Sequence, residues 1–244
     1  SQEWAAAPTI ARCELEANLA LLRWITNRQR NDVAIRAVKR ALAGCDYQSL
    51  AIASMLMNLL RSPAQAPELR AELEKLEPHH RAEDLLGLRA QLAVLEHDGE
   101  TAIREAVAWS RYDAMNPYAA AIAVHLLSDL AGRYEEAVEI GVKAVRRNPT
   151  HVLLVNNTAY ALSLAGRAHE ASQLLKPLMR LAGDHVALTA TMALAELLSG
   201  DTAAGLAGYR RAWDLAVTEG DTSLAHLVLL NQALAVSLAG VVPD

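Results

Sequence analysis

Apolar side chains return every three or four residues along most of the chain, and short polar breaks separate these runs. Within residues 134–145, one helical face collects Ala137, Val138, Gly141, Val142 and Val145. The breaks carry a single Gly, which suits a left-handed helix cap, or an Asn-Pro pair, whose Pro cannot continue the preceding helix. The pattern therefore predicts amphipathic helices joined in pairs by short turns.

The turn glycines return at a fixed period. Gly132, Gly166 and Gly200 are each separated by 34 residues. Small or apolar residues keep the same step, in the two series Ala137, Ala171, Gly205 and Ala144, Leu178, Ala212. Small side chains at fixed places indicate neighbouring helices that approach closely, at the short end of the usual interaxial distances. The chain is therefore predicted to be built from repeated helix pairs.

This repeat resembles the tetratricopeptide repeat (TPR), which combines this period with Gly between two helices, two Ala in the second helix and a Pro at the end of the unit. In one unit these features are Gly132, Ala137, Ala144 and Pro149. The family's bulky aromatic near the start of the first helix is missing, since Ala121, Val155 and Thr189 stand there. The resemblance implies an all-α, right-handed α-solenoid of stacked antiparallel helix pairs.

The domain organisation expected from this resemblance is a single TPR-like superhelical domain over residues 1–244. It comprises about six helix pairs and a final helix over 223–240, with the clearest repeats at 84–217 and degenerate repeats at 8–77. The degenerate part predicts helices over residues 8–27, 31–43, 47–61 and 67–76. Because the chain starts at Ser1 without a methionine, we expect it to be a fragment of a longer protein.

Composition and charge favour the same fold class and exclude one class of partner. The chain is 52% hydrophobic, mainly Ala and Leu, and only 4% aromatic, which favours helix over strand. Its 23 basic residues are scattered and are outnumbered by 28 acidic ones, so no electrostatic footprint for nucleic acid is present. The most apolar stretches, 50–60 and 225–242, are too short or too often interrupted by polar residues to predict a membrane span.

The common catalytic and phosphate-binding motifs are missing from the sequence. It has no His-Glu-x-x-His, Gly-x-Ser-x-Gly, Gly-x-x-x-x-Gly-Lys or Gly-x-Gly-x-x-Gly, and its glycines occur singly, as helix turns require. Cys13 and Cys45 stand outside any Cys-x-x-Cys pair and are expected to be unpaired structural residues. We therefore predict that the protein is not an enzyme and binds no cofactor.

Two histidines, His80 and His125, each have an Asp four residues later. His80 and Asp84 would lie four residues apart on one helical face and could chelate a metal, but Pro78 followed by acidic residues is typical of a helix start, so no metal is expected. His125 has Asp129 one turn later and no nucleophile in register. We expect His125 to be a buried, hydrogen-bonded histidine and not a catalytic base.

The resemblance also implies where a partner would bind, because family members contact peptides through groove-facing positions of the first helices. By register these positions include Arg89, Ile122, Leu126, Asp129, Asn156, Tyr160, Ala190 and Leu194. Since Arg89 is the only basic residue among them, a clamp for a terminal carboxylate is not expected. The row continues with Leu227, Leu230 and Leu234, although leucines at helical spacing are more often core than binding surface.

Two positions are the expected polar handles of this groove, Asn156 and Tyr160. Asn157 and Asn231 could serve likewise or could satisfy backbone groups between helices, and the second interpretation is favoured.

The function predicted from these features is a non-catalytic scaffold that binds a peptide or helix of a partner protein in its concave groove. Self-association through the ends of the solenoid would be a second mode of assembly. The alternative is a regulatory or sensor arm of a larger multidomain protein, such as a transcription regulator, a transferase or an envelope or secretion assembly factor. The full-length sequence would separate these interpretations.

Overall fold

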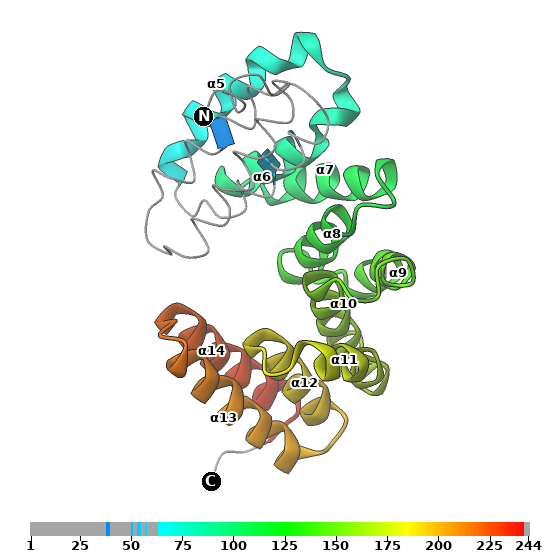
Figure 1. Ribbon diagram of the computed structural model, residues 1–244, viewed down its shortest axis with the longest axis vertical. Coiled ribbons are helices and arrows are strands. Elements are labelled where there is room, and N and C mark those ends of the chain that lie inside the picture. Colours follow the sequence, from blue (N-terminus) through cyan, green and yellow to red (C-terminus); the bar gives the residue numbers. More distant parts are fainter. Residues whose placement is uncertain (1–37, 40–49, 51–52, 55–56, 58–62, 242–244) are drawn as a thin grey trace, which may run out of the picture. The chain divides into compact units, whose positions relative to one another are not determined.

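The computed structural model describes residues 38–39, 50, 53–54, 57 and 63–241, and its regular structure there is helical (Figure 1). The α-helices are α5 (Ala66–Leu76), α6 (Leu86–Leu95), α7 (Gly99–Tyr112), α8 (Pro117–Asp129), α9 (Tyr134–Val145), α10 (Val152–Leu164), α11 (Ala168–Ala182), α12 (Val186–Leu198), α13 (Thr202–Thr218) and α14 (Thr222–Leu238). They confirm the predicted all-α fold. The helices predicted over residues 8–27, 31–43 and 47–61 lie largely outside the described residues.

The turns inside each pair form as the glycine pattern predicts. Gly166 and Gly200 have positive φ angles of 77° and 94°, the left-handed conformation that favours glycine. The next N–H in each turn reaches back to the end of the first helix, with Arg167 N to Leu162 O at 2.8 Å and Asp201 N to Glu196 O at 3.0 Å. These hydrogen bonds satisfy carbonyls that the helix end would otherwise leave free.

The helices α7, α8, α10, α13 and α14 begin at residues whose side chains accept backbone N–H groups. Asn116 caps α8, with its Oδ1 accepting from Tyr118 N at 3.0 Å and Ala119 N at 3.3 Å. His151 does the same for α10 through Nδ1, 3.2 Å from Leu154 N, and its burial lowers its pKa. The lowered pKa favours the neutral imidazole, which keeps the lone pair that the cap requires.

The chain divides into two compact units after Asp113. In the first unit α6 packs on α7, and Gly87 lets them approach, because a Cβ at this position would lie 2.9 Å from the Trp109 ring. The second unit contains the pairs α8/α9, α10/α11 and α12/α13, followed by α14. The single domain over residues 1–244 stays a prediction.

Within the second unit the first helices of successive pairs are neighbours. α10 packs between α8 and α12, and α12 also contacts α14. The second helices α9, α11 and α13 each contact the first helices on both sides of them. The periodic small residues lie at these contacts, since Ala137, Ala171 and Ala212 are fully buried. This is the stacking of helix pairs that the repeat predicts.

The described residues contain neither a membrane-spanning helix nor a cluster of metal ligands. None of their helices has the length and apolar character needed to cross a bilayer. Over the same residues, potential metal ligands do not gather in groups of three or more.

Candidate functional site

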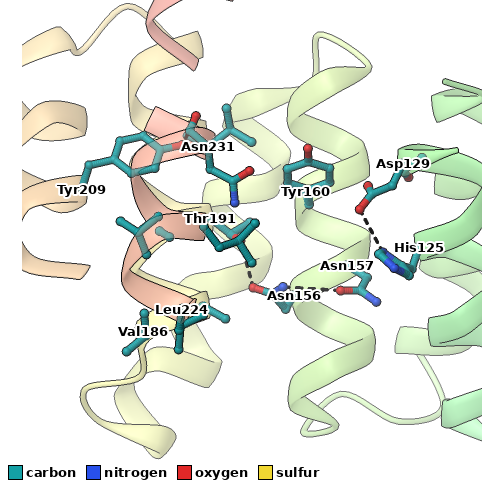
Figure 2. Close-up of a pocket in the computed structure, with 16 residues that line it drawn as sticks. His125, Asp129, Asn156, Asn157, Tyr160, Val186, Thr191, Tyr209, Leu224 and Asn231 are labelled. Atoms are coloured by element: carbon teal, nitrogen blue, oxygen red, sulfur yellow. Dashed lines mark hydrogen bonds and ion pairs between the residues drawn. The ribbon is translucent and has the colours of Figure 1, made fainter. Parts of the chain in front are cut away.

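A cavity of about 200 Å³ opens on the face that α8, α10, α12 and α14 share in the second unit (Figure 2). We call it the first-helix cavity. The residues from α8 and α10 are polar: His125, Ser128, Asp129, Asn156, Asn157 and Tyr160. Those from α12 and α14 are mostly apolar: Val186, Ala187, Ala190, Leu194, Leu224, Leu227 and Val228, with Thr191 and Asn231. Tyr209 of α13 completes the lining.

Helical spacing explains why these side chains share a face. Each first helix contributes positions three or four residues apart, such as His125, Ser128 and Asp129 in α8, and such positions lie side by side along a helix. The cavity therefore has a polar half, formed by α8 and α10, and an apolar half, formed by α12 and α14.

A chain of side-chain hydrogen bonds connects three of the helices. Thr191 Oγ1 donates to Asn156 Oδ1 at 2.9 Å, and Asn156 Nδ2 donates to Asn157 Oδ1 at 3.4 Å (Figure 2). Asn157 Nδ2 then donates to the backbone oxygen of Ala121 at 3.1 Å. Asn157 thus satisfies a backbone group of the neighbouring helix, as the favoured interpretation predicted. The polar wall is already ordered by its own hydrogen bonds.

His125 is paired but not buried. Its Nδ1 lies 3.0 Å from Asp129 Oδ2, so the two side chains are in contact across one turn of α8. The predicted burial is wrong, because the His125 side chain is 47% exposed and that of Asp129 is 39% exposed. The physical reason is the direction of this face of α8, which points into the open cavity and not against another helix.

Two tyrosines line the cavity with raised pKa values. Burial, and then the nearby charge of Asp129, raises the pKa of Tyr160 to about 12. Burial also raises the pKa of Tyr209, whose hydroxyl donates to the backbone oxygen of Asn231 at 3.3 Å. Both hydroxyl groups therefore remain protonated donors at neutral pH. Tyr160 lines the polar half of the cavity, near enough to Asp129 for that carboxylate to influence its pKa.

Ser128 is a cavity residue that the sequence did not indicate. It is 4% exposed, and its Oγ has no hydrogen-bond partner among the described residues. Two buried hydroxyls of α10 donate to the carbonyl four residues earlier, Thr158 to Leu154 at 2.7 Å and Ser163 to Ala159 at 2.9 Å. Ser128 therefore lines the cavity, but its hydroxyl is buried and is not used by its own helix.

This difference predicts opposite results for two matched substitutions. Ser128→Ala should raise the free energy of unfolding by about 0.5–1 kcal/mol, because it removes an unpaired buried hydroxyl and adds a better helix former. Ser163→Ala, which removes a made hydrogen bond, should leave stability unchanged or lower it. Urea denaturation followed by circular dichroism measures both. A Ser128→Ala protein less stable than the Ser163→Ala protein would show that Ser128 is satisfied.

The positions predicted for a groove do not all meet. Asp129, Asn156, Tyr160, Ala190 and Leu194 line the first-helix cavity together. Ile122 and Leu126 are buried among the helices of the second unit. Arg89 belongs to the first unit, where its guanidinium lies 2.9 Å from Glu77. Of the predicted leucine row, Leu227 lines the cavity, whereas Leu230 and Leu234 are exposed on α14.

The residues considered for a metal are arranged differently from the prediction. His80 has an extended backbone and Asp84 lies in a 3₁₀ turn, so the two do not share an α-helical face. The Asp84 carboxylate accepts from Arg81 Nη2 and from the Tyr112 hydroxyl, both at 2.9 Å. These hydrogen bonds, led by that of Arg81, hold the pKa of Asp84 below its ordinary value. Asp84 therefore joins Arg81 to α7 as a structural group.

Neither protein-family models nor curated proteins match the sequence. Several solved structures are similar, among them a thermophilic TPR protein from Thermus thermophilus, with a TM-score of 0.54 and 17% identity over 84% of this chain and 100% of that one. PilW, a widely conserved type IV pilus biogenesis factor, has a TM-score of 0.51 and 14% identity over 82% of this chain and 91% of its own. A TPR protein from Parabacteroides merdae has a TM-score of 0.51 and 14% identity over 91% of this chain and 93% of its own. At these identities the likeness concerns the fold, and the chain has a TPR-like, all-α solenoid fold.

Proposed function

We propose that this protein is a non-catalytic interaction scaffold that binds a peptide segment of a partner protein in the first-helix cavity. The observation that carries the proposal is the cavity itself, to which four successive first helices contribute side chains. An apolar half provides surface to bury, and a few polar groups fix the orientation of what binds there. The volume of about 200 Å³ is below the range of roughly 300–1,000 Å³ typical of small-molecule sites, and it suits one or two peptide side chains.

The arrangement of Ser128, His125 and Asp129 does not favour catalysis. All three residues line the cavity, and His125 is oriented by Asp129 as a catalytic base would be. An activated serine must hydrogen-bond to its base and must be accessible to a substrate. The Ser128 hydroxyl is buried and makes no hydrogen bond to His125 or to any other described residue. This supports a binding role for the cavity, in which His125 and Asp129 are the exposed members of the three.

The binding role can be tested by blocking the cavity. A library of random peptides is selected on the wild-type protein, and the affinity of the selected peptides is measured by fluorescence polarisation. Ala187→Trp places an indole in the apolar half and should abolish binding, since Ala187 lines the cavity and is only partly buried. Ala207→Trp, on the exposed side of α13, is the matched control and should bind as the wild type does.

Two results would contradict the proposal. One is a failure to select any peptide, and the other is a set of peptides that bind Ala187→Trp and Ala207→Trp equally well. Circular dichroism of both variants establishes that a loss of binding is not a loss of fold.

A further inference from the structure

The charge of the first-helix cavity is unbalanced. Its titratable lining residues are His125, Asp129, Tyr160 and Tyr209, and it is lined by no lysine, arginine or glutamate. Asp129 is thus the one carboxylate in the lining, and the tyrosines are neutral. A ligand that brought an anion into this space would lie close to Asp129 with no lysine or arginine to compensate, which is unfavourable away from bulk water.

The polar half also has acceptors that its own hydrogen bonds leave available. His125 contacts Asp129 at Oδ2, and a carboxylate can accept at both oxygens. The Tyr160 oxygen lies in the same half of the cavity (Figure 2). A primary ammonium or a guanidinium, which carries several N–H donors and no acceptor, is the group that fits such a set.

The apolar half indicates what accompanies the cation. Ala187 and Ala190 are small, and with Leu194, Leu227 and Val228 they provide a wall without charge. Small side chains on α12 leave space that a Leu, Met or aromatic side chain of the ligand can fill, and burying such a side chain contributes most of the affinity.

We propose that the first-helix cavity recognises a peptide segment in which a cationic nitrogen adjoins a large apolar side chain. The cation binds Asp129 with the Tyr160 hydroxyl group, and the apolar side chain packs against α12 and α14. This inference rests on the proposed function and specifies its ligand. The cation is a Lys or Arg side chain or the N-terminal ammonium of the peptide, since all three present the same donors.

The test uses the selected peptides and three variants of the whole chain. The wild type should select sequences enriched in Lys or Arg beside Leu, Met or aromatic residues. Asp129→Asn, which keeps the shape of the side chain, should lower the affinity for these peptides about tenfold or more, as expected when a charge-assisted hydrogen bond is lost. Asp129→Lys should reverse the selection toward Asp and Glu. Glu100→Lys, an exposed position on α7 with the same change in net charge, is the control and should select as the wild type does.

Synthetic versions of each peptide identify the source of the cation. If acetylation of the N-terminus abolishes binding, the cation is the terminal ammonium, and if replacement of Lys or Arg by Gln does so, it is the side chain. Peptides without a cationic preference, or peptides that bind Asp129→Asn as tightly as the wild type, would overturn this inference. The proposed function would still stand in that case if Ala187→Trp blocks them, whereas peptides that Ala187→Trp does not block would refute both.

Discussion

Ala171→Arg should unfold the second unit. Ala171 is fully buried on α11, between the first helices α10 and α12 that this helix contacts. A guanidinium at this place must either displace both neighbours or remain buried without a partner, and each outcome costs more than about 4 kcal/mol. Thermal unfolding followed by the circular dichroism signal of the helices should show a large loss of helix or a strongly lowered melting temperature.

The matched control for this substitution is Ala182→Arg, at the exposed end of the same helix. It should change the free energy of unfolding by less than about 0.5 kcal/mol, as exposed substitutions usually do. A well-folded Ala171→Arg protein with the stability of the control would contradict the repeat register, because that register places Ala171 at a helix contact.

Gly205→Ala should destabilise the protein, although Ala is the residue found at the corresponding positions 137 and 171. A Cβ at residue 205 would lie 2.7 Å from Leu197 Cγ, 2.9 Å from Leu197 N and 3.0 Å from Ala193 O. Two of these atoms belong to the backbone of α12 and cannot move aside as a side chain can. Overpacking of this kind costs about 1–3 kcal/mol, against a gain of about 1 kcal/mol in helix propensity. We expect a net loss of up to about 2 kcal/mol in urea denaturation.

The intrinsic preference of α13 for Ala over Gly is measured separately by Ala207→Gly, at an exposed position of the same helix. Subtracting that value isolates the cost of the contact with α12. If Gly205→Ala instead raises stability by the propensity difference alone, α12 and α13 are further apart than described.

These two substitutions also show why the fold could be read from the sequence. Helix formation and helix ends depend on local features, namely a period of 3.6 residues and glycines such as Gly166 that adopt positive φ. The 34-residue repeat of small side chains then predicts which positions meet, and Ala171 is one of them. The sequence could not show that α13 lies so close to α12 that position 205 excludes even a methyl group, since that distance depends on the packing of whole helices.

The candidate site was predicted in part, for a related reason. Asp129, Asn156 and Tyr160 were identified because the repeat register transfers a face from one first helix to the next. One residue along a helix turns the side chain by about 100°, so Leu126 is buried while its neighbour His125 faces the cavity.

Serine and threonine residues were the hardest to interpret. Most hydroxyls in a helix bond to the preceding turn, and spacing alone does not reveal that Ser128 does not. Thr191 was likewise not indicated, because its bond to Asn156 joins two helices 35 positions apart in the sequence.

The hydrogen-bond chain from Thr191 through Asn156 and Asn157 to Ala121 fixes the spacing of α12, α10 and α8. The width of the cavity is therefore set before a ligand binds, and binding loses little further side-chain entropy in the polar half. Because the cavity does not widen, ligand side chains of the wrong length would bind weakly. A preorganised polar half would thus let the protein discriminate between peptides of similar sequence.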